Sequence, residues 1–148
     1  DRTLTRALYK ALQASGMKLQ NYGTVLATIA KGDKEEALPL IRRFYELGFN
    51  IEATHGTAVF LKEHGIRTRI RKKLSEGSEE ILDSIRRGYV TYVINTRDIN
   101  ADSELDGYAI RRCAVENNVT MFTALDTVRV LLDVLEETTL CISTVDAD

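Results

Sequence analysis

Ala53-Thr54-His55-Gly56-Thr57 is the stretch that decides the fold of this chain. The residues before it, 49–52, alternate as a β-strand does, and residues 58–63 after it read as a helix. A strand that ends in Thr-x-Gly-Thr and opens a helix presents backbone N–H groups at the positive end of the helix dipole. The two hydroxyls add donors, and the glycine lets a ligand approach the backbone. The stretch therefore predicts a phosphate pocket, with simple helix capping as the alternative.

Strand-like and helix-like segments alternate about five times along the chain. The expected strands cover residues 25–30, 49–53, 68–72, 90–94 and 119–122. The expected helices begin near Asp33, Ala58, Ser78, Tyr108 and Leu125. This order predicts an α/β fold with a three-layer, doubly wound, mainly parallel five-stranded sheet and helices on both faces.

Local signals set the expected ends of several helices. Asp33 and Glu36 have the spacing of a capping box. Ser78 is expected to cap a later helix, and residues 95–102 to form a polar loop before the next one. Apolar residues at helical spacing predict a buried stripe on the last helix, at Leu125, Val128, Leu131, Leu132 and Leu135.

The composition is that of one ordinary globular domain. The chain has 148 residues, 44% hydrophobic and 28% charged, which is enough to bury a core. Its formal net charge of −2 gives no reason to expect a nucleic acid as partner. No apolar run reaches membrane-spanning length, so no membrane is expected either. Cys113 and Cys141 are too few for a disulfide scaffold, which favours a reducing, cytoplasmic setting.

The amino-terminal end is expected to differ from the rest. Residues 1–22 contain a helical face that Gly16 closes, and we expect a connecting helix there, followed by a single domain over residues 23–148. The start, Asp1-Arg2-Thr3-Leu4, lacks a methionine and is neither a signal nor a transit sequence. We therefore expect a piece of a longer chain.

Three polar segments follow expected strands: residues 31–34, 54–57 and 95–97. They would meet at the carboxyl edge of a parallel sheet, where such folds bind ligands. Lys34 would oppose the dipole of its own helix, and a bound phosphate would make that placement favourable, although a free surface lysine is the simpler interpretation. Asn95 and Thr96 suit a sugar hydroxyl or the edge of a base, or else a plain turn.

A basic run follows the second helix of the predicted core. Arg67, Arg69 and Arg71 would share one face of a strand and Lys72 the other, as expected of a solvated edge strand. One lysine of this run could still reach an anion at the carboxyl end of that strand. Because no aromatic residues are interleaved, the run does not predict nucleic-acid binding.

The two histidines do not predict a metal site. His55 and His64 lack Cys, Asp or Glu neighbours at the spacing of metal ligands. His55 is expected to cover the phosphate pocket or to pack at its rim.

Six short motifs occur in this order: Gly32-Asp33-Lys34, Gly48-Phe49, Ala53-Thr54-His55-Gly56-Thr57, Glu76-Gly77, Tyr92-Val93-Ile94-Asn95-Thr96 and Ile110-Arg111-Arg112. In order and spacing they resemble the C-terminal regulatory domain of the large chain of carbamoyl phosphate synthase. The resemblance covers nearly all of residues 23–137 and implies the methylglyoxal-synthase-like fold. The combination is far more specific than any one motif.

The resemblance implies binding of a nucleotide effector: UMP as inhibitor, and IMP or phosphoribosyl pyrophosphate as activator. The phosphate would be held by Lys34, Thr54, Thr57 and Lys73, with His55 and Gly56 in the same turn and Asn95 and Thr96 toward the ribose or base. Arg97 stands where several relatives carry a small hydroxyl residue, and would bind a second phosphate or crowd a base. Residues 98–106 form a longer expected loop than in some relatives.

The resemblance also implies a parent enzyme, a ligase that makes carbamoyl phosphate from glutamine and bicarbonate with ATP, for pyrimidine and arginine biosynthesis. The implied partners are the other synthetase domains and a glutaminase small subunit, with a second copy of the chain as a further candidate. No cofactor is expected in this domain.

Two other functions stay open. A true methylglyoxal synthase acts on dihydroxyacetone phosphate and needs a carboxylate base beside the phosphate. Catalytic relatives carry a Gly-Gly-Asp turn where this chain has Glu76-Gly77-Ser78, and a serine is not a competent base. Glu79 and Glu80 are expected to face solvent, so no catalytic residue is expected. A module for self-association is the third possibility.

Overall fold

The fold is built on a sheet of five parallel strands. The structure, a computed structural model, describes residues 22–72, 78–96 and 101–147. The strands lie in the order β3-β2-β1-β4-β5, and every neighbouring pair within the described residues is parallel. Their bounds are β1 Thr24–Thr28, β2 Asn50–Thr54, β3 Thr68–Arg71, β4 Tyr92–Asn95 and β5 Thr120–Phe122. The predicted α/β class is confirmed.

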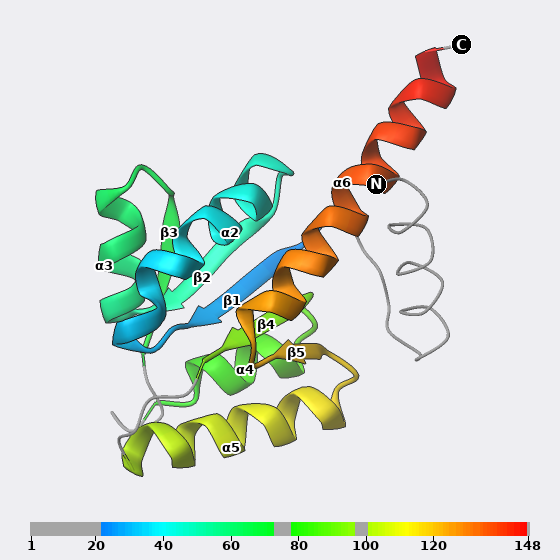
Figure 1. The fold of residues 1–148 in the computed structure, drawn as a ribbon. Helices are drawn as coiled ribbons and strands as arrows, with labels where there is room; N and C mark the ends of the chain where they lie inside the picture. Colours follow the sequence, from blue (N-terminus) through cyan, green and yellow to red (C-terminus); the bar gives the residue numbers. More distant parts are fainter. Residues whose placement is uncertain (1–21, 73–77, 97–100, 148) are drawn as a thin grey trace.

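Helices cover both faces of this sheet (Figure 1). Helices α2, α3 and α6 pack on one face, whereas α4 and α5 pack on the other. The bounds are α2 Lys34–Glu46, α3 His55–Glu63, α4 Glu80–Arg86, α5 Ala101–Glu116 and α6 Leu125–Ala147, with a short 3-10 turn, η1, at Lys31–Asp33. The predicted three-layer architecture is confirmed.

Neighbouring residues of one strand enter different cores, because both faces of the sheet are covered. Val25 and Ala27 of β1 pack with α2, α3 and α6, whereas Leu26 packs with α4 and α5. The larger core centres on Tyr92, whose ring centroid lies 5.9 Å from that of Phe49. The predicted apolar stripe of α6 is confirmed, since all five of its residues are buried: Leu125, Val128, Leu131, Leu132 and Leu135.

Two helices are followed by residues that suit a left-handed backbone conformation. Gly48 follows α2 with a φ of 101°. Glycine reaches this conformation without a steric clash because it has no Cβ. Asn118 follows α5 with a φ of 58°, and asparagine is the residue that best tolerates this region after glycine.

The predicted capping box at Asp33 and Glu36 is wrong. The Asp33 N–H donates to the Ala30 carbonyl at 2.9 Å as part of η1, and the backbone of Asp33 is already helical. A capping side chain reaches the first turn only from an extended backbone. Asp33 therefore makes no capping hydrogen bond to α2.

The predicted loops over residues 95–102 and 98–106 are wrong in part. Helix α5 begins at Ala101, well before the predicted start at Tyr108. Its first turn is rich in acidic residues, which suit the positive end of a helix dipole as well as they suit a loop. The polar character of residues 101–107 therefore did not distinguish a loop from the first turns of a helix.

The predicted connecting helix lies in residues 1–21, outside the described residues, so the domain boundary near residue 22 stays a prediction. Among the described residues, no helix has both the length and the apolar character needed to cross a bilayer.

A buried ion pair joins β2 to the edge strand β3. Glu52 points to the α4 face of the sheet, and its side chain is 7% exposed. Its Oε1 accepts a hydrogen bond from Arg71 Nε at 2.7 Å and a longer one from Ser84 Oγ at 3.3 Å. The bond to Glu52 raises the pKa of the Arg71 guanidinium. A buried carboxylate is tolerated here because it is paired and hydrogen-bonded.

We expect Glu52→Ala to lower the free energy of unfolding by about 3 kcal/mol, because Arg71 would keep its charge in a largely buried place without a partner. Urea denaturation measures the change. Glu46→Ala, at an exposed position near the end of α2, is the matched control and should shift stability by less than about 0.5 kcal/mol. Equal midpoints for the two variants would contradict the role given to Glu52.

Candidate functional site

Three strand ends and two helix starts meet at one edge of the sheet. β2, β1 and β4 are adjacent and parallel, so their carboxyl ends lie together. Helices α2 and α3 begin at this same edge (Figure 1). The structure thus brings residues 31–34, 54–57 and 95–96 to one place, as the sequence predicts.

The end of β2 turns directly into α3. Thr54 is the last residue of the strand and the N-cap of the helix, with extended backbone angles of −68° and 160°. The helix begins at His55, earlier than the predicted start at Ala58. His55 and Gly56 are exposed, so the first turn of α3, with its unpaired N–H groups, lies open to a ligand.

The Thr54 side chain lies at the mouth of this turn. The residue is 6% exposed, yet its hydroxyl makes no capping hydrogen bond to α3. The predicted contact of this hydroxyl with a phosphate stays a prediction.

The amino group of Lys34 reaches from α2 to the first turn of α3. Lys34 is the first residue of α2, and its Nζ would lie 3.3 Å from a Cβ built on Gly56. The amine thus occupies the space beside Gly56, near the positive ends of two helix dipoles. A cation is unfavourable there unless an anion lies between them. Among the side chains that the structure describes, those of residues 22–72, 78–96 and 107–137, Lys34 forms no ion pair that would supply this anion. The predicted contact between Lys34 and a phosphate agrees with this placement and stays a prediction.

The Thr57 and Thr96 hydroxyls hold the chain that leaves β1. Ile29 N–H donates to Thr57 Oγ1 at 3.3 Å, and Ala30 N–H donates to Thr96 Oγ1 at 2.7 Å. The two residues, on α3 and after β4, thus fix the path of the segment that leads to Lys34. Thr57 does not cap α3, and its role as a phosphate donor stays a prediction. The spacing Thr-x-Gly-Thr does not distinguish a hydroxyl that binds phosphate from one that accepts a hydrogen bond from a neighbouring segment.

Asn95 is the last residue of β4, and its side chain is held from two sides. Thr28 Oγ1 donates to Asn95 Oδ1, a contact that the sequence analysis missed because Thr28 belongs to another strand. Asn95 Nδ2 would lie 3.0 Å from a Cβ built on Gly107 of α5, so a side chain at position 107 would press on this amide. Asn95 is 9% exposed and therefore presents little of itself to solvent.

A hollow of about 270 Å³ opens beside Thr96. Its walls come from the start of α2 and the start of α6, and they carry carboxylates: Asp33, Glu36 and Asp126, with Thr123 beside them. Carboxylates accept hydrogen bonds from hydroxyl and amino groups but repel phosphate. The carboxyl edge of the sheet therefore carries a positive charge at Lys34 and negative charges around the hollow beside Thr96. Among the described residues, no group of three or more His, Cys, Asp or Glu side chains is placed to hold a metal ion.

Lys73 and Arg97 lie outside the described residues. Their predicted roles at the phosphate stay predictions.

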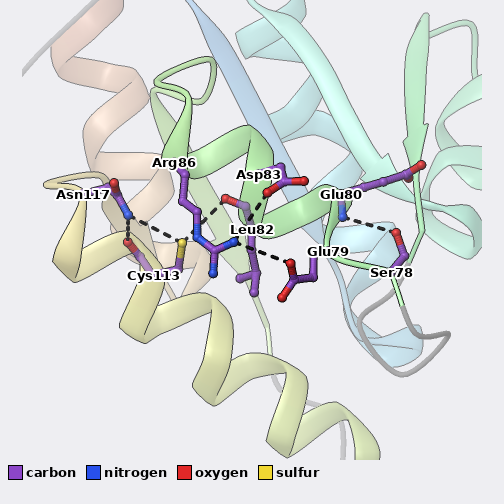
Figure 2. Close-up of polar contacts among 8 residues, drawn as sticks. All are labelled: Ser78, Glu79, Glu80, Leu82, Asp83, Arg86, Cys113 and Asn117. Carbon is purple, nitrogen blue, oxygen red and sulfur yellow. Dashed lines mark hydrogen bonds and ion pairs between the residues drawn. The ribbon is translucent and has the colours of Figure 1, made fainter.

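The acidic residues near Ser78 are engaged in holding α4 (Figure 2). Ser78 Oγ accepts a hydrogen bond from Glu80 N–H at 3.2 Å, although α4 itself begins at Glu80 and not at Ser78. The Glu80 carboxylate accepts the Lys72 N–H at 2.8 Å, and Glu79 lies 3.8 Å from Arg86. Glu79 faces solvent as predicted, whereas Glu80 is half-buried and ties the end of β3 to α4.

Figure 2 also shows Cys113 between α5 and α4. Its Sγ lies 3.7 Å from the Leu82 carbonyl oxygen, and burial raises the pKa of the thiol. Cys113 is thus a buried packing residue, and its burial disfavours the thiolate that a nucleophile needs.

Comparison with known proteins agrees with this architecture. A family model described as the MGS-like domain matches residues 36–123. Among solved structures, the chain is similar to a methylglyoxal synthase from Elizabethkingia anophelis NUHP1, with a TM-score of 0.63 and 18% identity, over 77% of this chain and 79% of that one. At this identity the likeness concerns the fold alone. Because the family match spans more than half of the sequence, the chain belongs to the MGS-like domain family.

Proposed function

We propose that this chain is the regulatory domain of the large chain of a carbamoyl phosphate synthase, and that it binds a phosphorylated nucleotide at the carboxyl edge of the sheet. The observation that carries the proposal is the Lys34 amine, which lies beside Gly56 with no anionic partner among the described residues. The phosphate would lie between Lys34, the Thr54 hydroxyl and the first N–H groups of α3.

The rest of the nucleotide would extend toward β4. Asn95 and Thr96 lie on that side, and the acidic hollow next to Thr96 suits the hydroxyls of a ribose or an amino group of a base. Lys73 would join the phosphate from the end of β3, and Arg97 would meet a second phosphate such as that of phosphoribosyl pyrophosphate.

The effector would act by favouring one arrangement of this domain against the synthetase domains. It shifts the activity of the parent enzyme only by the difference in its affinity for the two arrangements. A tenfold difference corresponds to about 1.4 kcal/mol, which a few charge-assisted hydrogen bonds supply. The proposed parent is a cytoplasmic, glutamine-hydrolysing ligase whose partner is a glutaminase small subunit.

A catalytic methylglyoxal synthase is the second candidate, and the similar solved structure favours it. Proton abstraction from dihydroxyacetone phosphate needs a carboxylate free to accept the proton. Here Ser78 stands in the place of the aspartate, and its hydroxyl is bonded to Glu80 N–H. The Glu80 carboxylate is already bonded to Lys72 N–H. These contacts favour a sensor over an enzyme.

Removing the charge at Lys34 or the hydroxyl at Thr54 should weaken binding of UMP by about 1–3 kcal/mol, the usual worth of a charge-assisted hydrogen bond. Isothermal titration calorimetry on Lys34→Ala and Thr54→Ala measures the loss. Thr54→Ser should retain affinity because it keeps the hydroxyl. Lys62→Ala, at an exposed position near the far end of α3, is the matched control for charge. Unchanged affinity in both alanine variants would remove them from the site.

Gly56→Ala should weaken UMP binding without lowering the stability of the fold. The added methyl would lie 3.3 Å from Lys34 Nζ, the flexible end of a side chain, so the fold should accommodate it. The methyl would nevertheless fill the space where a phosphate approaches the backbone. We expect an unfolding midpoint equal to or above that of the parent chain, because alanine favours a helix, together with a loss of UMP affinity. Retained affinity would show that no phosphate lies against Gly56.

Two simple measurements distinguish a nucleotide-binding regulatory domain from a catalytic methylglyoxal synthase. Thermal denaturation with UMP, IMP and phosphoribosyl pyrophosphate should raise the midpoint for at least one effector, because a ligand that binds the folded state stabilises it. Incubation with dihydroxyacetone phosphate should release no methylglyoxal. Formation of methylglyoxal would establish the enzyme instead.

A further inference from the structure

A second charged surface lies away from the phosphate site, on the α4 side of the sheet near β3. A groove of about 640 Å³ runs there, along the edge strand and the amino ends of β1 and β2. Its charged walls are Arg67, Arg69 and Arg71, with Glu52 at its base, and Tyr45 and Tyr89 flank it. The alternation predicted from the sequence is confirmed, since all three arginines line the same groove and Lys72 does not.

The charges in this groove are unbalanced. Arg69 is in register with Glu52 on β2, yet the Glu52 carboxylate is bonded to Arg71 and Ser84. Arg67 and Arg69 are exposed, and neither forms an ion pair with any other described residue. Two guanidinium groups therefore face the groove without an ion-pair partner in the part of the chain whose side chains are described.

The edge of the sheet at this place accepts another strand. Among the described strands β3 is the outermost, and within them it is paired with β2 on one side only. A strand at an edge has backbone N–H and C=O groups that an added strand can pair. Tyr89 is 57% exposed and Tyr45 38%, so apolar rings are available at the flank of the groove.

We propose that an acidic peptide segment of a partner protein adds to β3 as a further strand, with alternate carboxylates facing Arg67 and Arg69. Side chains on one face of a strand repeat every second residue, about 6.6 Å apart, as Arg67 and Arg69 do. Residues directly opposite on paired strands lie about 5 Å apart, which is within reach of a guanidinium–carboxylate pair. A small anion would instead require donors that converge on one point. This interaction does not depend on the phosphate site.

The opposing interpretation is that the arginines only prevent edge-to-edge aggregation. It predicts no affinity for an extended acidic chain. The two interpretations therefore differ in a binding measurement.

Fluorescence anisotropy with the 148-residue chain tests the proposal. The probe is a short fluorescein-labelled peptide in which Glu and Val alternate, and it should bind, whereas the same peptide with Lys for Glu should not. Methylating alternate backbone nitrogens keeps the charge but prevents strand pairing, and should reduce affinity about tenfold or more. Absence of binding, or equal binding of the methylated peptide, would overturn the proposal.

Matched variants locate the contact. Arg67→Gln with Arg69→Gln should weaken peptide binding about tenfold or more, whereas Arg111→Gln with Arg112→Gln, exposed on α5, should leave it unchanged. Lys34→Ala should also leave it unchanged, which separates this surface from the nucleotide site. An equal loss in the two double variants would show non-specific attraction and refute the assignment, as would tighter binding of a labelled single-stranded oligonucleotide.

Discussion

Lys34 brings a positive charge to the first turn of α3, where the helix dipole and the unpaired N–H groups already produce a positive potential. This repulsion is the physical reason to expect an anion at the site. It exists because the sheet is parallel, so that α2 and α3 both begin at the edge where β1 and β2 end. A doubly charged phosphate would relieve the repulsion and satisfy the N–H groups at once.

The site is also held in place before any ligand arrives. Thr57 and Thr96 accept hydrogen bonds from Ile29 and Ala30, so the segment that carries Lys34 is fixed from α3 on one side and from β4 on the other. A ligand that touches both α3 and the end of β4 would act on the same segment. Under the proposed function, the contacts of these two threonines would be a route by which a bound nucleotide changes the position of α2.

Much of the fold is predictable from the sequence, because alternation of short apolar runs with amphipathic helices determines a parallel sheet. The sequence also predicts that Lys34, Thr54 and Asn95 lie at one edge, since each stands at or after the carboxyl end of a strand. It does not reveal contacts between strands, such as Thr28 with Asn95, or the hydrogen bonds that occupy Thr57. It misplaced the cap at Asp33 and the start of α5 because an acidic segment suits a turn, a cap and a first helical turn equally.

Family membership and fold do not by themselves distinguish a sensor from an enzyme, so the chemistry at the edge of the sheet decides between them. The most direct test of the phosphate site is an NMR titration of isotope-labelled chain with UMP, read at the backbone amides. The account predicts that the largest shifts occur at His55, Gly56 and Lys34. Shifts confined to β3 and Tyr89, or no shift in the first turn of α3, would contradict it.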